Sequence, residues 1–263
     1  MLEEKFAEGS SFIHKLDPRI KVISCIVFIF SVASLTNFYA SVVAFLLGVI
    51  FLLLANLIKK KTILTLIKIN GFILFLWCVI PFSAGGEKIF SFWKLSVTKE
   101  GIDLCLLLTL KSNAILMGII SMLLTQPAPV LGKALSCLKF PSKFVFLLLI
   151  SYRYINLIYE EYNRLMTAAK LRGFVPKTNL KTYKTIGYIF SMVLIKSYDR
   201  AERIYKAMVL RGFKGKFYTL YEFSASKKDY IFCGATILLS LFLVAIELKG
   251  DYILGLWRLL SSI

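Results

Sequence analysis

Hydrophobic residues gather into five runs that are long enough to cross a membrane as helices. A spanning helix needs about 20 mostly apolar residues to match a hydrocarbon core of about 30 Å. The first two runs are separated by almost nothing, which predicts a tight antiparallel pair. The pattern therefore predicts an all-α fold, a polytopic membrane helix bundle with about five spans. These cover residues 20–36, 38–58, 63–82, 102–125 and 230–248.

A second kind of pattern follows the fourth run. Residues 144–150 and 186–195 are apolar but too short to span, and runs of this length are typical of buried or interfacial helix. Residues 142–172 contain no Gly or Pro, and their apolar side chains recur at spacings of three and four. This spacing predicts an amphipathic helix with a basic opposite face. Its apolar stripe consists of Ile155, Ile158, Tyr162, Leu165 and Ala169.

Composition and charge orient these helices. Of 263 residues, 58% are hydrophobic and only 18% are charged, which is more apolar surface than one water-exposed globule buries. Lys and Arg outnumber Asp and Glu by 33 to 15, and residues 139–229 hold 18 basic against 6 acidic residues, an excess of 12. Basic residues gather on the cytoplasmic side of membrane proteins. This block and the lysines at 59–61 are therefore placed inside, with the loop 83–101 and the C-terminus outside.

The orientation divides the chain into three predicted parts. Residues 1–125 form an N-terminal membrane bundle of four spans, residues 126–229 a cytoplasmic helical domain, and residues 230–263 the final span and a tail. Residues 1–11 are acidic and polar, whereas a cleavable signal needs a basic and then an apolar stretch, so we expect the first span to be retained. The N-terminus is expected on the cytoplasmic side.

Two lysines lie five or more residues inside a predicted span. Lys68 is near the inner end of the third span, so its ammonium can reach the interface. Lys111 lies about ten residues into the fourth span, where a charge costs about 2.5–3.5 kcal/mol on insertion scales. It either lines a polar pathway or reaches backbone carbonyls or a hydroxyl inside the bundle, and the sequence leaves both readings open.

Residue patterns that perform chemistry are missing from the sequence. The five cysteines form no C-x-x-C pair and are expected to pack or to face lipid, and His14 has no neighbouring Cys or carboxylate cluster. There is no phosphate-binding G-x-x-x-x-G-K-[S/T] loop, no G-x-S-x-G and no H-E-x-x-H. We therefore expect no catalytic residue, no bound metal and no cofactor on this chain, and an energy source on other chains.

The most informative feature is a near-repeat at an offset of 39 residues. Each copy contains Tyr and an acid, then Arg, Ala and a closing Leu-Arg-Gly-Phe. The Gly suits the left-handed position that ends a helix, and the preceding Arg then lies in the last turn, where the helix dipole favours a cation. The copies are Tyr159-Glu160, Arg164, Ala168, Leu171-Arg172-Gly173-Phe174 and Tyr198-Asp199, Arg203, Ala207, Leu210-Arg211-Gly212-Phe213.

A single Arg before a helix-ending Gly is common and purely structural. Two copies, each closing an amphipathic helix in one basic domain, favour a shared task. An exposed guanidinium flanked by Leu and Phe suits an acidic-rimmed groove on another protein. We predict a docking surface formed by Leu171, Arg172, Gly173, Leu210, Arg211 and Gly212, supported by Arg164, Ala168, Phe174, Arg203, Ala207 and Phe213.

These motifs resemble the transmembrane T components of energy-coupling factor (ECF) transporters, the CbiQ family. Leu16-Asp17-Pro18-Arg19-x-Lys21 is similar to the family's N-terminal signature, and residues 153–173 and 197–215 are similar to its two coupling helices. The resemblance implies a membrane bundle joined to a cytoplasmic coupling domain of crossed helices. Two Ala-Arg-Gly motifs of that domain plug into two ABC-type ATPases, which bind the ATP. Here Leu171 and Leu210 replace the Ala.

The resemblance also implies a role and partners. The chain is then a non-enzymatic subunit in the plasma membrane of a prokaryote, embedded in the lipid bilayer beside a small integral-membrane subunit that binds the substrate. The second coupling helix looks closest to the cobalt or nickel branch; the alternative is the branch that serves vitamin-binding subunits.

Readings of other classes are a self-sufficient secondary transporter or channel with Lys111 in its pathway, and an enzyme acting on lipid, for which no catalytic constellation is present. Nucleic-acid binding is not expected, because membrane orientation accounts for the basic block.

Overall fold

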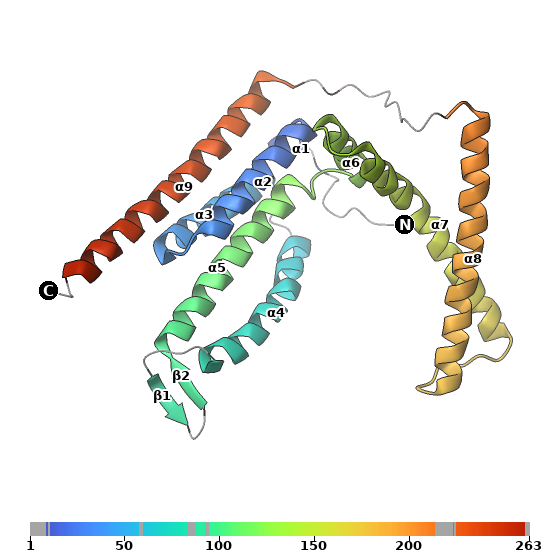
Figure 1. Ribbon diagram of the computed structural model, residues 1–263, viewed down its shortest axis with the longest axis horizontal. Helices are drawn as coiled ribbons and strands as arrows, with labels where there is room; N and C mark the ends of the chain where they lie inside the picture. Colours follow the sequence, from blue (N-terminus) through green and yellow to red (C-terminus); the bar gives the residue numbers. More distant parts are fainter. Residues whose placement is uncertain are drawn as a thin grey trace. The chain divides into compact units, whose positions relative to one another are not determined.

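The computed structural model describes residues 9, 11–57, 60–83, 88–92, 95–213, 223 and 225–260. Nearly all of this part is helical (Figure 1). Its elements are α1 (Phe12–Lys15), α2 (Pro18–Ser34), α3 (Phe38–Leu54), α4 (Lys60–Ser83), β1 (Lys88–Phe92), β2 (Leu95–Thr98), α5 (Lys99–Met122), α6 (Ala128–Cys137), α7 (Ser142–Leu171), α8 (Leu180–Leu210) and α9 (Lys227–Leu260).

The chain forms two compact units. We call one the coupling unit, Leu135–Glu222, which contains α7 and α8. We call the other the bundle unit; it comprises Glu4–Ala134 and Phe223–Ile263 and contains α1 to α5, most of α6, and α9. The coupling unit lies within the block that the charge pattern separates from the membrane spans.

The bundle unit packs its helices around α2, α3 and α5. Helix α3 lies along α5, α2 contacts both α5 and α9, and α4 contacts α5. The buried ring of Phe28 meets Phe51 edge-on, with centroids 5.3 Å apart. Gly118 of α5 faces that same ring, and a Cβ at this position would lie 2.8 Å from it. A small residue is therefore needed for α2 and α5 to approach so closely.

All five predicted spans are helices, but they differ in length. Within the described residues, three helical segments are long and apolar enough to cross a membrane: Thr62–Ser83, Lys99–Met122 and Lys227–Glu247. Helices α2 and α3 have 17 residues each. Helix α3 ends at Leu54 rather than at residue 58 because Asn56 adopts a left-handed φ of 53°, and Leu57 N–H then bonds back to Leu52. The membrane helix bundle is confirmed.

A small β-hairpin joins α4 to α5, which the sequence analysis did not predict. Strands β1 and β2 pair antiparallel, with Phe92 opposite Leu95. Thr98 ends the hairpin and caps α5, since its Oγ1 accepts from Gly101 N–H at 3.3 Å. The hairpin occupies the loop that the charge pattern places outside the membrane.

Helices α7 and α8 form the coupling unit. The two short apolar stretches, 144–150 and 186–195, are not separate helices but parts of α7 and α8, which have 30 and 31 residues. In Figure 1 the two helices cross each other, connected by residues 172–179. The helix predicted for 142–172 is confirmed, with α7 ending one residue earlier, but Ile155 and Ile158 of its predicted apolar stripe are exposed.

Candidate functional site

The two repeated segments end their helices in the same backbone motif. In α7, Gly173 N–H donates to the Lys170 carbonyl at 3.0 Å, and Phe174 N–H donates to the Ala169 carbonyl at 3.0 Å. This pair of bonds is the Schellman motif, which satisfies carbonyls that a helix end leaves open. Gly173 has φ of +82°, the left-handed conformation that a side chain disfavours.

Helix α8 repeats this geometry 39 residues later. Gly212 N–H donates to Val209 at 2.9 Å, Phe213 N–H donates to Met208 at 3.0 Å, and Gly212 has φ of +81°. The left-handed glycines are therefore confirmed at both ends. The sequence predicted Arg172 and Arg211 in the last helical turn. In the structure each is the C-cap residue, one position after its helix ends.

Both ends expose the side chains predicted to dock. Leu171 is 85% exposed and Leu210 is 88% exposed, unusually high values for leucine. Each neighbouring arginine is exposed as well. Of the supporting residues, Arg164, Ala168, Arg203 and Ala207 are exposed and Phe174 and Phe213 are half-buried. Each helix end thus presents an apolar and a cationic side chain together.

The two ends lie at opposite ends of the α7–α8 pair and are not side by side. Phe213, just after α8, stacks against Phe146 near the start of α7, with ring centroids 6.1 Å apart. Farther along α7, the ring of Tyr162 packs against the ring of Phe190 of α8, with ring centroids 5.8 Å apart. These contacts fix an antiparallel arrangement, so Arg211 lies toward the beginning of α7 while Arg172 lies at its end.

A half-buried ion pair joins α7 to α8. Lys196 of α8 donates to the Oε1 of Glu161, a buried residue of α7, and Arg164 lies 3.5 Å from the other oxygen. The Lys196 hydrogen bond holds the pKa of Glu161 below its ordinary value, helped by the nearby charges of Lys196, Arg164 and Arg200 and opposed by burial. The carboxylate stays charged, which fixes the register of α8 on α7.

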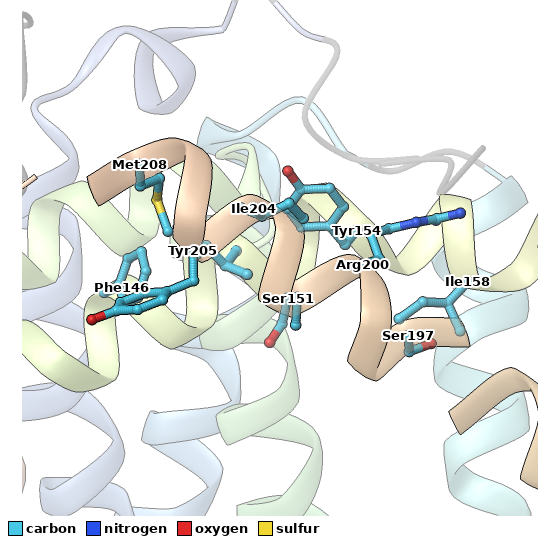
Figure 2. A pocket seen from close by; sticks show the side chains of 11 residues that line it. Phe146, Ser151, Tyr154, Ile158, Ser197, Arg200, Ile204, Tyr205 and Met208 are labelled. Atoms are coloured by element: carbon cyan, nitrogen blue, oxygen red, sulfur yellow. The ribbon is translucent and has the colours of Figure 1, made fainter. Parts of the chain in front are cut away.

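A groove of about 350 Å³ runs between α7 and α8 (Figure 2). Its lining is mostly apolar; in Figure 2, Phe146, Tyr205 and Met208 gather at one end and Ile158 and Ser197 at the other. Beside it, Arg211 and Ala207 line a second hollow of about 250 Å³ together with Arg153. The structure therefore brings two predicted residues of the second motif into one depression.

Lys111 binds a helix end in the bundle unit. Its Nζ donates to the carbonyls of Ala33 at 2.9 Å and Leu35 at 2.5 Å, at the end of α2. Of the two readings that the sequence left open, this arrangement is the second one, in which the lysine satisfies backbone carbonyls. Lys68 is exposed on α4.

Sequence reasoning missed a second charged residue that bonds the same turn. Glu247 of α9 is buried, and its carboxylate accepts from Thr36 N–H at 2.6 Å and from Asn37 N–H at 3.1 Å. A cation on the carbonyls of 33 and 35 and an anion on the amides of 36 and 37 thus hold the α2–α3 turn. The position of Glu247 at the end of an apolar run was the available signal.

In the described part of the chain, histidine and cysteine side chains do not cluster with acids. Among the residues that the structure describes, no three His, Cys, Asp or Glu side chains lie close enough to share a metal ion. His14 is half-buried and bonds Ser11 at 2.6 Å. All five cysteines are free thiols, two buried and two exposed. That this chain binds no cofactor stays a prediction.

Comparisons with known proteins agree with the resemblance. Residues 9–219 match the model of the CbiQ family, described as "Cobalt transport protein". An uncharacterized protein of Methanocaldococcus jannaschii, MJ1089, is 28% identical over 88% of this chain and 88% of its own length. The energy-coupling factor transporter transmembrane protein EcfT of Streptococcus equi subsp. equi is 27% identical over 80% of this chain and 82% of its own.

EcfT of Leuconostoc gelidum subsp. gasicomitatum is 29% identical, again over 80% of this chain and 82% of its own length. The family match covers the bundle helices α2 to α5 and both helix ends of the coupling unit. The chain therefore belongs to the CbiQ family, the transmembrane T components of energy-coupling factor transporters.

Proposed function

We propose that this chain couples two ABC-type ATPases to a separate membrane subunit that binds the substrate, and that each ATPase receives one arginine-tipped helix end. One observation carries the proposal: two exposed helix ends with the same Schellman geometry lie at opposite ends of one antiparallel pair. Two equivalent helix ends at separate positions are better suited to bind two equivalent ATPases than to make two contacts with one partner.

The chemistry of the ends supports docking into an acidic-rimmed groove. The guanidinium of Arg172 or Arg211 offers a planar set of donors that matches a carboxylate in two parallel bonds. The adjacent Leu171 or Leu210 is almost fully exposed and gains from burial in an apolar pocket. Arginine with a buried apolar anchor is the usual composition of an energetically dominant contact.

The length and rigidity of the helices support transmission of movement. Helix α8 has 31 residues, and at 1.5 Å per residue it is about 46 Å long. The Glu161–Lys196 pair fixes where α8 crosses α7. ATP binding closes the ATPases, the grooves carry both helix ends with them, and the crossed helices pass the displacement to the bundle. Only a partner that binds the two helix arrangements differently can drive this change.

We further propose the plasma membrane of a prokaryote, with the N-terminus and the coupling unit in the cytoplasm, where the ATPases find ATP. The basic excess of residues 139–229 supports this orientation. In this arrangement the chain itself binds no ATP and performs no catalysis. The lipid bilayer covers the exposed apolar side chains of α4.

For the cargo, we propose cobalt or nickel. The family description, which names cobalt transport, and the Asp199-to-Phe213 segment of the second coupling helix support this assignment. The competing proposal is a shared subunit that serves vitamin-binding partners. Uptake of radiolabelled Co²⁺, compared with uptake of a labelled vitamin by the same cells, separates the two.

The docking proposal is tested by charge reversal. Arg172→Glu combined with Arg211→Glu should release the ATPases from the detergent-solubilised complex and abolish transport, while the protein stays in the membrane. Lys181→Glu combined with Lys184→Glu is the matched control, since it reverses two exposed cations of the same unit. Normal retention of the ATPases by the arginine variant, or equal loss in both variants, would refute docking by these helix ends.

A self-sufficient transporter or channel is the reading from another class. The two carbonyl bonds of Lys111 give this residue a structural task in place of a pathway role. Vesicles that contain this chain alone should show no cargo uptake. Uptake without ATP in such vesicles would favour the transporter.

A further inference from the structure

The chain crosses between its two units twice, and we call these two crossing points passages. The residues of the bundle unit that border the two passages meet in one side-chain cluster. The first passage follows Ala134 and the second precedes Phe223. Lys133 of α6, the penultimate residue before the first passage, has its Nζ 5.1 Å from the ring centroid of Phe223. Two positions that are far apart in the sequence are thus neighbours where the chain enters and leaves the coupling unit.

Arg19 holds Phe223 from the start of α2. Its Nη2 donates to the Phe223 carbonyl at 2.9 Å, and its guanidinium carbon lies 5.4 Å from the centroid of the Phe223 ring. The same guanidinium is fixed by Asp17, which accepts from Nε at 3.2 Å and from Nη2 at 2.9 Å. Phe223 is therefore bound through both its backbone and its ring.

The start of α9 is attached to the same place. Asp229, a buried residue in the first turn of α9, accepts from Ser226 N–H at 2.6 Å and from Asp17 N–H at 3.1 Å. Asp17 also caps α2, since its carboxylate accepts from Arg19 N–H at 2.9 Å. The helices that begin on either side of this cluster cannot separate without breaking these bonds.

We propose that Phe223 is a positioning residue for energy coupling. Together with Asp17, Arg19 and Lys133 it forms what we call the Phe223 clasp, which fixes both passages from the coupling unit to the common start of α2 and α9. The inference rests on the proposed coupling function and adds the point at which movement enters the bundle. An open clasp would leave the two passages independent, and ATP hydrolysis would then move less cargo.

The size of the effect follows from the two cations that face the ring. Replacing the ring by an aliphatic side chain removes both cation–π contacts and shifts the equilibrium between closed and open clasp by roughly 5- to 25-fold. The hydrogen bond from Arg19 to the backbone carbonyl remains in such a variant. The change is therefore selective for the clasp.

Phe223→Leu tests the clasp in the complete complex reconstituted into liposomes, with radiolabelled Co²⁺ as cargo. We expect normal amounts of bound ATPase, continued ATP hydrolysis and several-fold less cargo per ATP hydrolysed. Phe223→Tyr keeps the ring and should restore the wild-type ratio. Tyr230→Leu, at an exposed aromatic residue early in α9, is the matched control and should keep it as well.

A wild-type ratio of cargo to ATP in Phe223→Leu, or no rescue by Phe223→Tyr, would overturn the clasp. A wild-type complex that retains no ATPase would instead count against the proposed function.

Crosslinking tests the clasp without any assumption about the cargo. To keep the clasp side chains, cysteines replace their neighbours Val130, one turn before Lys133 in α6, and Ala225, two residues after Phe223. The chain is freed of its own cysteines, and a protease site follows Pro176. A bifunctional maleimide should join the two fragments both with and without ATP, while Val130→Cys paired with Leu241→Cys should not be joined. No crosslink between 130 and 225, or one that ATP abolishes, would refute a clasp that stays closed.

Discussion

Replacing Gly212 by alanine should loosen the end of α8 at which Arg211 is displayed. Gly212 has φ of +81°, and a Cβ built there meets no atom within 4 Å. Steric collision is therefore excluded as a cause, and only the backbone conformation opposes the side chain. This makes Gly212→Ala a clean measure of the left-handed helix end.

The expected magnitude follows from that conformation alone. A left-handed residue with a Cβ costs about 1–2 kcal/mol, and the reduced freedom of alanine in the opened state offsets about 0.4–1 kcal/mol. The net destabilisation is about 1 kcal/mol, which corresponds to roughly a fivefold shift toward the opened helix end. The same argument holds for Gly173, with φ of +82° and no atom near its Cβ position.

Gly187 provides a control of opposite sign within the same helix. It also has no atom within 4 Å of a built Cβ, but it lies inside α8 without a left-handed φ. Alanine is favoured over glycine in a helix interior by about 0.5–1 kcal/mol. Gly187→Ala should therefore stabilise α8 while Gly212→Ala destabilises its end.

Hydrogen exchange followed by mass spectrometry on the detergent-solubilised full chain measures both effects. Peptides that contain the amides of Gly212 and Phe213, which form the closing bonds, should exchange roughly fivefold faster in Gly212→Ala. They should exchange no faster than wild type in Gly187→Ala. Unchanged exchange in Gly212→Ala, or equal acceleration in both variants, would show that the left-handed glycine does not hold this end.

Three further predictions concern polar contacts. Lys111→Met should lower the unfolding temperature, because losing hydrogen bonds from a charged donor to the helix-end carbonyls costs about 1.5–3 kcal/mol, whereas Lys68→Met should leave it unchanged; transport lost at unchanged stability would restore the pathway reading. Asn70→Leu should destabilise by about 1–2 kcal/mol, because Asn70 and Asn113 exchange hydrogen bonds at 2.9 and 3.0 Å between α4 and α5. The double Leu variant should recover most of that loss, and thermal unfolding of the three variants checks it. The lowered pKa of Glu161 means that its stabilisation is complete above the ordinary value of 4.5 and is lost as the pH falls through the lower folded value. Denaturation of Glu161→Gln should therefore lack this acid-sensitive step, and an identical acid profile in both proteins would contradict the assignment.

The helices were predictable because their signals are local. The five apolar runs and the three-and-four spacing in α7 each lie within one helix, and the Gly after Arg172 and Arg211 marks a helix end on its own. Each copy of the 39-residue repeat is likewise a short motif that can be recognised within one helix. These features therefore appeared in the structure at nearly the predicted positions.

Contacts between distant residues could not be predicted in this way. The bonds of Glu247 to Thr36 and of Arg19 to Phe223 join residues separated by more than 200 positions. The partner of Glu161 likewise lies on the next helix, and nothing in the local pattern distinguishes Lys196 from other lysines. The antiparallel placement of the two helix ends also depends on such pairings, Phe146 with Phe213 among them.

The bonds of Lys111 and Glu247 to the α2–α3 turn have a consequence for folding during synthesis. Lys111 and Glu247, which complete the hydrogen bonds of this turn, are synthesised well after α2 and α3. Until then, water or lipid headgroups have to satisfy the amides of Thr36 and Asn37, since bare amides are costly in hydrocarbon. The α2–α3 turn is thus completed only when residue 247 has been made, and a nascent chain arrested before that residue carries an open turn for quality-control proteases to recognise.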